Sequence, residues 1–178
     1  MPIKKKVPAQ KPAAKSAKSA KADNELNYAL KPGTRAPAFS LSDDTGKTRT
    51  LADFKGRKLV IYFYPKDNTP GCTQESCDFR DNVNRLTSSG AAVVGVSADS
   101  AASHAGFKKK YGFNFPLLSD PERSMIKAYS VWQKKSLYGR EYMGIMRTTY
   151  IVDEKGVITH AFSRVKVTGH VDEVLKAL

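Results

Sequence analysis

The segment 59–77 constrains the fold of this chain more than any other, because it joins a strand signal to a helix signal across a short loop. Leu59–Tyr64 is a run of aliphatic, β-branched and aromatic residues that a proline stops, which predicts a buried strand. Thr69 is a good N-cap residue and Pro70 suits the first helical position. We therefore expect a helix to begin there and to continue to Gly90.

Both cysteines of the chain lie in this predicted helix. Cys72 falls in its first turn, where the unpaired N–H groups and the positive end of the helix dipole favour an anion such as a thiolate. Cys77 follows five residues later, so ideal geometry puts the two Cα atoms about 8 to 9 Å apart, whereas a disulfide needs less than about 7 Å. A bond between them requires the helix to unwind, which favours a transient disulfide; a structural disulfide and two unreactive thiols are the alternatives.

The residues that surround the cysteines form a specific pattern. Thr69-Pro70-Gly71-Cys72-Thr73 is followed by Glu75, Cys77 and Phe79-Arg80-Asp81. This pattern resembles the active-site segment of the peroxiredoxins, in particular the branch of bacterioferritin comigratory protein and PrxQ. The resemblance extends from about Thr34 to the end of the chain. It implies a thioredoxin-like fold and thiol-dependent reduction of hydrogen peroxide and organic hydroperoxides, without a metal or an organic cofactor.

The resemblance also implies a role for each matching residue. Cys72 would attack the peroxide and become a sulfenic acid. Cys77 would resolve it as an intramolecular disulfide, which thioredoxin, or a glutaredoxin or glutathione system, would reduce. Thr69 would hydrogen-bond the thiolate and the peroxide, and Pro65 would shield the pocket from water. Arg147, at the start of a later apolar strand, matches the active-site arginine of the family; without the resemblance, a surface arginine would be the simpler interpretation.

Other polar residues have simpler explanations. Glu75 and Arg80 match the family pattern, but both are common choices along a helix dipole, and we assign them no catalytic role. His104, His160 and His170 occur singly, without the paired spacing of a zinc site, and are expected as surface or helix-end residues. A cysteine hydrolase with a histidine base is a lower-ranked alternative.

Strands and helices alternate along the rest of the chain, which predicts a three-layer α/β sandwich. The resemblance adds that this sandwich is thioredoxin-like, with a central mixed sheet. The expected strands are Phe39–Leu41, Ala91–Ser97, Phe115–Leu118, Thr148–Val152 and Val157–Phe162, and the expected helices are Ser100–Tyr111, Pro121–Tyr129 and one from Val171.

An aromatic segment precedes Arg147. Trp132, Tyr138 and Tyr142 alternate there with basic residues. The resemblance to the peroxiredoxins implies a loop near the active site here, whose aromatic side chains pack over the pocket or contact the alkyl part of a hydroperoxide. A nucleic-acid stacking surface is the alternative interpretation.

The amino-terminal segment differs from the rest in composition. Residues 1–24 are rich in Lys, Ala and Pro, and Met1–Ala22 contains seven lysines and no acidic residue. We expect a disordered basic arm, followed by a thioredoxin-like peroxiredoxin domain over 25–178. Without those lysines the formal charge of +13 falls to +6. The arm is expected to be a solubilising tail, with a weak, salt-sensitive contact to DNA or RNA as the main alternative and a targeting segment as a further one.

Two classes of function follow from these patterns. The preferred one is a thioredoxin-dependent peroxidase in antioxidant defence, and the other is a nucleic-acid-associated basic protein with a redox-sensing or protective thiol domain. An apolar stretch of membrane-spanning length and a secretory signal are both missing from the sequence, and two cysteines suit a reducing compartment, so a cytoplasmic location is expected. An intramolecular cysteine pair makes a monomer sufficient.

Overall fold

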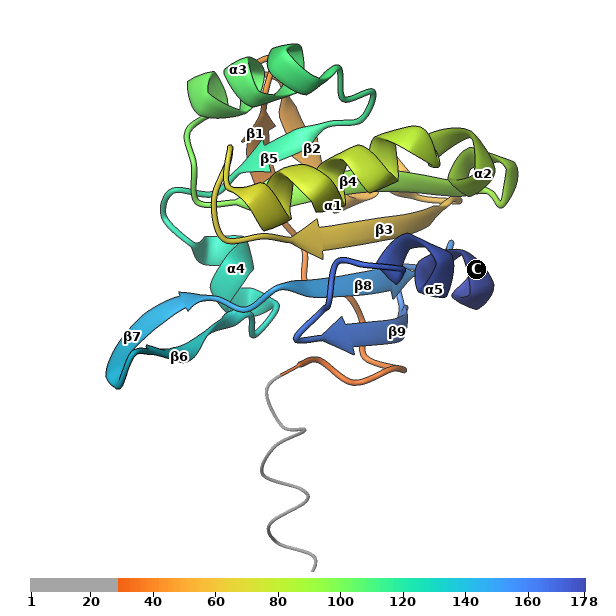
Figure 1. The fold of residues 1–178 in the computed structure, drawn as a ribbon. Helices are drawn as coiled ribbons and strands as arrows, with labels where there is room; N and C mark the ends of the chain where they lie inside the picture. Colours follow the sequence, from red (N-terminus) through yellow and green to blue (C-terminus); the bar gives the residue numbers. More distant parts are fainter. Residues whose placement is uncertain (1–28) are drawn as a thin grey trace, which may run out of the picture.

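The computed structural model describes residues 29–178, and its centre is a seven-stranded sheet (Figure 1). Its strands are β1 (Ser40–Asp43), β2 (Thr48–Thr50), β3 (Lys58–Phe63), β4 (Ala91–Ser97), β5 (Leu117–Ser119), β8 (Thr148–Val152) and β9 (Ile158–Ser163). They lie in the order β2-β1-β5-β4-β3-β8-β9. β4 pairs in parallel with β3 and β5, and the other neighbours pair antiparallel, so the sheet is mixed as predicted.

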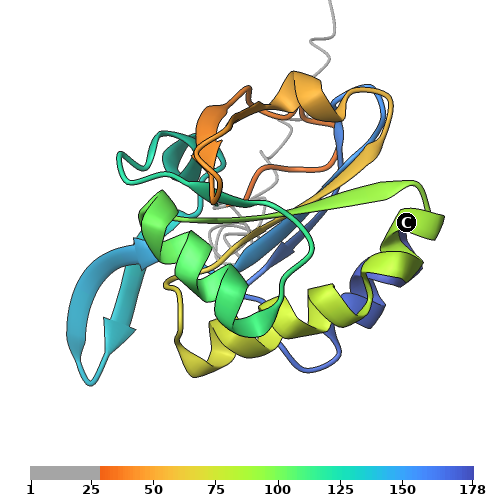
Figure 2. The same ribbon diagram turned by 90° about the horizontal axis from the view of Figure 1, so that it is seen from above.

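Helices cover both faces of this sheet (Figure 2). One face carries α1 (Pro70–Asp81), α2 (Val83–Ser88), α3 (Ala101–Tyr111) and α5 (His170–Ala177). The other carries the short helices η1 (Leu51–Phe54) and α4 (Ser124–Ala128). The molecule therefore has the predicted three layers, with one apolar core on each side of the sheet.

The central strand β3 fixes the position of α1. Its side chains alternate between the two cores: Val60 and Tyr62 face α1, and Ile61 and Phe63 face α4. All four are 0% exposed. The Tyr62 ring stacks on Phe79 of α1 at 4.6 Å between centroids. Burial of each such side chain stabilises the fold by about 1.5 to 3 kcal/mol, so α1 is held firmly against the sheet.

Most predicted elements are confirmed within a residue or two. The strand before the cysteines, the helix that begins at Pro70, the helix capped by Ser100 and the closing hairpin of β8 and β9 all form. Ser100 accepts a hydrogen bond from the Ser103 amide, as an N-cap should. The prediction was wrong where the helix after Cys72 was expected to run without interruption to Gly90. It breaks at Asn82, whose side-chain amide donates to the Asp78 carbonyl and competes with the helical hydrogen bonds.

Two further elements differ from the prediction. The helix expected over Pro121–Tyr129 is only the five-residue α4, because Arg123 at its N-cap has φ of 59° and blocks an earlier start. The strand β2, which pairs with β1 across the turn at Gly46, was not predicted.

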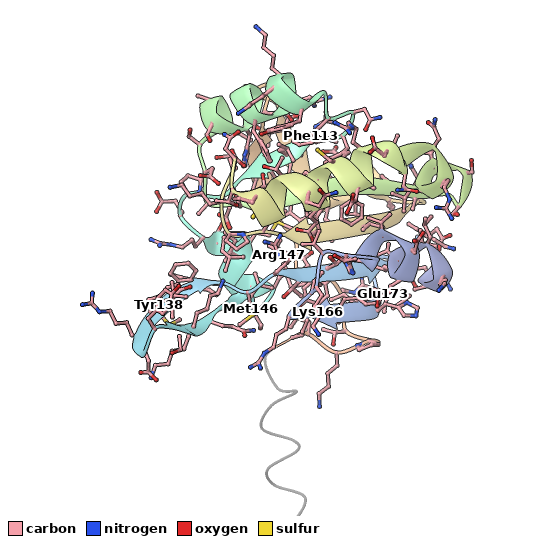
Figure 3. The ribbon with its side chains drawn as sticks, in the orientation of Figure 1. Phe113, Tyr138, Met146, Arg147, Lys166 and Glu173 are labelled. Atoms are coloured by element: carbon pink, nitrogen blue, oxygen red, sulfur yellow. The ribbon has the colours of Figure 1, made fainter. Side chains whose placement is uncertain are left out.

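The aromatic segment is a hairpin instead of a loop. β6 (Trp132–Leu137) and β7 (Arg140–Ile145) pair antiparallel and project from the body of the molecule (Figure 1). They join at Tyr138 and Gly139, whose φ values of 50° and 74° suit a two-residue hairpin turn. Tyr138 is 97% exposed at the tip (Figure 3), so it does not pack over the pocket as expected.

The prediction for the histidines was wrong at His104. His104 lies inside α3 and is 0% exposed, whereas His160 is exposed and His170 begins α5. The basic arm predicted for residues 1–24 lies outside the described residues. None of the helices within residues 29–178 combines the length and apolar character that a membrane crossing requires.

Candidate active site

Cys72 lies in the first turn of α1, as the sequence predicted. Thr69 is extended and ends the preceding loop, and Pro70 occupies the first helical position. The Cys72 side chain is 1% exposed and belongs to the core that contains Tyr62 and Phe79. A thiol so placed meets the amino-terminal end of the helix dipole while the packed core limits its access to water.

Arg147 reaches Cys72 from the other end of the sequence. It lies in the short connection between β7 and β8, beside the start of α1 (Figure 3). Its Nη2 is 3.3 Å from the Cys72 Sγ, and its carbonyl accepts a hydrogen bond from the Val165 amide at 3.0 Å. A Cβ at Gly71 would lie 3.3 Å from the same Nη2, so glycine there leaves room for the guanidinium. The arginine is thus positioned to donate a hydrogen bond to the Cys72 sulfur.

Glu75 is the residue that the sequence interpretation undervalued. Its carboxylate is 1% exposed and accepts a hydrogen bond from Arg147 Nη1 through Oε2, while Oε1 has no partner among the described residues. Burial outweighs the attraction of Arg147 and raises the pKa of Glu75 to about 7. The spacing in the sequence could have indicated that Glu75 lies near the site, since it is three residues from Cys72 on the same helix face. Its burial depends on packing that the sequence does not reveal.

The Thr69 hydroxyl has a different partner from the one expected. It donates to the Lys66 carbonyl at 2.8 Å, so its proton is not directed at the Cys72 sulfur in this structure. Its oxygen can still accept a hydrogen bond.

Pro65 lies at the rim of a groove that leads to Arg147. The groove has a volume of about 450 Å³ and is lined by Pro65, Lys134, Lys135, Ser136, Met146, Arg147, Arg164 and Val165. Lys135, from the hairpin, donates to the Ile145 carbonyl at 3.1 Å. Burial and the nearby charge of Arg147 lower its pKa. The groove is therefore basic, with apolar side chains beside the guanidinium.

Cys77 lies on the same helix as Cys72 and is half-buried. Burial raises the pKa of its thiol, and Arg80 opposes the shift. Both cysteines are free, and α1 is continuous between them. With about 8 to 9 Å between Cα atoms five residues apart on an ideal helix, the two sulfurs bond only if the helix unwinds locally.

Other kinds of site have less support in this region. Among residues 29–178, no group of three or more His, Cys, Asp and Glu side chains could hold a metal ion. Within that same range no histidine forms a hydrogen bond with Cys72, and the ring nitrogens of His104 contact Asp67 and Leu118 instead. A cysteine hydrolase needs a histidine base beside its nucleophile, and within residues 29–178 no histidine is so placed at Cys72.

Comparison with known proteins agrees with this geometry. Residues 32–161 match the model of the AhpC/TSA family. Peroxiredoxin Bcp of Bacillus subtilis is 45% identical over 146 residues, which are 82% of this chain and 93% of that protein. Peroxiredoxin Bcp of Escherichia coli K12 is 42% identical over 84% of this chain and 96% of that protein.

Solved structures give the same result. Peroxiredoxin Q of Xanthomonas campestris superposes with a TM-score of 0.75 at 44% identity, over 78% of this chain and 88% of that one. A mutant of Xylella fastidiosa PrxQ superposes with a TM-score of 0.78 at 37% identity, over 83% and 94%. None of these relatives supports the alternative of a nucleic-acid-associated protein. The contact of Arg147 with Cys72 at the start of α1, the thioredoxin-like fold and the relatives agree: the chain belongs to the AhpC/TSA family, as a peroxiredoxin of the Bcp/PrxQ group and hence a thiol peroxidase.

Proposed function

We propose that Cys72 is the peroxidatic cysteine of this peroxidase. The observation that carries the proposal is the 3.3 Å contact between Arg147 Nη2 and the Cys72 Sγ at the start of α1. The thiolate attacks one oxygen of the hydroperoxide, an S–O bond forms, and the O–O bond breaks. Water or an alcohol leaves with a proton from solvent, and Cys72 becomes a sulfenic acid.

Arg147 and the start of α1 stabilise the charge that moves during this step. The guanidinium hydrogen-bonds the thiolate and then the peroxide oxygens. The free N–H groups near Gly71 and Cys72 face the negative charge that develops on the leaving oxygen. Thr69 contributes its hydroxyl oxygen as an acceptor for the peroxide O–H, and Pro65 keeps water from one side of the groove.

Cys77 resolves the sulfenic acid. Its sulfur attacks the Cys72 sulfur, water leaves, and an intramolecular disulfide forms after the helix between them unwinds. A dithiol protein, thioredoxin in our proposal, reduces this disulfide by exchange and returns both thiols. Because both sulfurs come from one chain, a monomer suffices for the cycle. Two free cysteines suit a reducing compartment such as the cytoplasm.

The test is peroxide consumption with thioredoxin and its reductase as the electron source. Wild-type protein is expected to turn over, and Cys72→Ser is expected to consume no peroxide. Full activity of the Cys72→Ser variant would refute the assignment. Cys77→Ser is the matched control, because it removes the other thiol and is expected to retain one stoichiometric oxidation of Cys72.

A further inference from the structure

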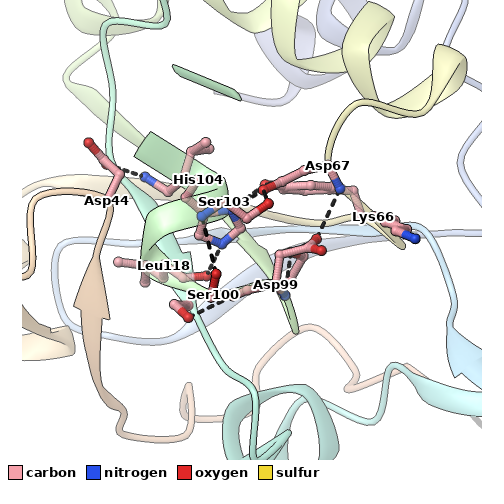
Figure 4. Close-up of polar contacts among 12 residues, drawn as sticks. Asp44, Lys66, Asp67, Asp99, Ser100, Ser103, His104 and Leu118 are labelled. Carbon is pink, nitrogen blue, oxygen red and sulfur yellow. Dashed lines mark hydrogen bonds and ion pairs between the residues drawn. The ribbon is translucent and has the colours of Figure 1, made fainter. Parts of the chain in front are cut away.

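A buried pair of polar side chains lies behind the loop that carries Pro65 and Thr69. Asp67 in this loop and His104 of α3 are 5% and 0% exposed, and the His104 Nδ1 is 2.8 Å from the Asp67 Oδ2 (Figure 4). The peroxidase chemistry proposed above does not use either residue. A buried polar pair away from the reacting atoms requires an explanation, because removing polar groups from water is costly unless they are hydrogen-bonded.

The Asp67 carboxylate is fully engaged. The Tyr64 hydroxyl donates to Oδ1 at 2.7 Å, and the Ser103 hydroxyl donates to Oδ2 at 2.8 Å beside His104. Burial alone would raise the pKa of Asp67, but the interaction with His104, followed by the hydrogen bonds from Tyr64 and Ser103, outweighs burial and lowers the pKa below its ordinary value. The group is therefore a carboxylate that only accepts hydrogen bonds.

The His104 ring has a hydrogen-bond partner at each nitrogen. Its Nε2 is 3.0 Å from the carbonyl oxygen of Leu118. Its Nδ1 faces the Asp67 carboxylate at 2.8 Å, with the Tyr64 hydroxyl at 3.4 Å. The ring therefore joins the active-site loop to α3 and β5 through both of its nitrogens.

The loop backbone is held from the same side. The Asp67 amide donates to Asp99 Oδ2 at 2.9 Å, and the Ser97 hydroxyl fixes that carboxylate at 2.7 Å. Directly after Asp67, Asn68 adopts φ of 59°, a conformation that non-glycine residues adopt at some cost. The chain is thus fixed at Asp67 and turns sharply into Thr69 and α1.

We propose that the Asp67–His104 hydrogen bond positions the active-site loop for the peroxidase reaction. It holds residues 65–69 so that Pro65 and Thr69 keep their places beside Cys72. When α1 unwinds so that Cys77 can approach Cys72, the chain before the helix stays fixed at Asp67. Both residues are positioning residues, since neither touches the reacting atoms. The inference rests on the proposed role of Cys72, which the Cys72→Ser variant tests separately.

The first test compares Asp67→Asn, His104→Gln and the double variant with the wild type. The measured quantity is the second-order rate constant for oxidation of Cys72 by hydrogen peroxide in one turnover, at a temperature where circular dichroism shows each protein folded. We expect each single variant to be slower by about 10- to 100-fold, the loss that displacement of reacting groups by about 1 Å causes. The double variant should be no slower than the slower single one, because both changes remove the same interaction.

Asp120→Asn is the matched control. Asp120 is also a fully buried carboxylate, and it accepts hydrogen bonds from the Ser124 amide, the Ser124 hydroxyl and the Ile126 amide at the start of α4. The Asp120→Asn variant should be less stable than wild type, while its rate constant for oxidation of Cys72 by hydrogen peroxide stays within about twofold of the wild-type value. If Asp67→Asn and His104→Gln behave like Asp120→Asn, the contact between Asp67 and His104 is only structural and the proposal is wrong.

A second measurement uses the wild-type protein and so does not depend on a variant that folds. Nitrogen NMR of the His104 ring should show both ring nitrogens hydrogen-bonded. In amide exchange, Asp67 should be equally protected in the reduced and the disulfide forms, whereas amides of α1 beyond Thr73 exchange faster after oxidation. A His104 ring nitrogen without a hydrogen bond, or an Asp67 amide that becomes exposed together with α1, would overturn the proposal.

Discussion

Glu75→Gln tests the electrostatics of the site through the pH dependence of stability. The glutamine keeps the shape and an acceptor for Arg147, but it cannot titrate. In the folded protein burial raises the pKa of Glu75 from 4.5 to about 7. Between these two pH values the unfolded chain has lost the proton and the folded protein still binds it, so the free energy of unfolding of wild type must fall as pH rises.

The expected magnitude follows from the size of this shift. Each pKa unit corresponds to about 1.4 kcal/mol, so ionisation of Glu75 costs the folded protein roughly 3 kcal/mol once the pH exceeds 7. This is a large part of the 5 to 15 kcal/mol typical of a folded domain. Below pH 4.5 the group is neutral in both states and contributes nothing to the difference.

Urea unfolding of wild type and Glu75→Gln at intervals from pH 4.5 to 8 measures this effect. Other titrating groups are common to both proteins and cancel in the difference. The variant should gain about 3 kcal/mol relative to wild type across this range, with the change complete near pH 7. A constant difference would refute the raised pKa. A difference of opposite sign would mean that the ion pair with Arg147 outweighs burial.

Three further outcomes are expected. Cys77→Ser should react once with hydrogen peroxide at close to the wild-type rate constant and then fail to turn over with thioredoxin; continued turnover would show that another thiol resolves the sulfenic acid. Arg147→Met should slow that first oxidation by about 100- to 1000-fold, and Arg147→Lys by less, because lysine keeps the charge but lacks the paired N–H donors of arginine. The rate constants are measured by stopped-flow kinetics, and wild-type values for both variants would contradict this expectation. A chain that begins at Asp23 should lose any salt-sensitive gel shift with DNA that the full chain shows, and equal binding by both would exclude the basic arm as its cause.

Local chemistry made much of the fold predictable. The start of α1 follows from Thr69 and Pro70, and β4 follows from a short apolar run that is rich in valine, because these signals act within a few residues. The hairpin of β6 and β7 was not predicted, because most of its side chains on both faces are exposed. A strand that buries neither face shows no alternation of apolar and polar residues.

The site was less predictable than the fold. Arg147 is 75 positions from Cys72, and only the family resemblance brought them together before the structure did. Glu75 and His104 were interpreted as ordinary helix residues because their types occur often on exposed helix faces. What distinguishes them is complete burial beside a charged partner, and that is a product of tertiary packing.

The most direct test of the proposed two-cysteine cycle is to oxidise reduced wild-type protein with one equivalent of hydrogen peroxide and map its peptides by mass spectrometry without reductant. We expect one disulfide between Cys72 and Cys77 within a single chain, which thioredoxin and its reductase convert back to two thiols. Thiols that stay unmodified, or a disulfide that joins two chains, would contradict it.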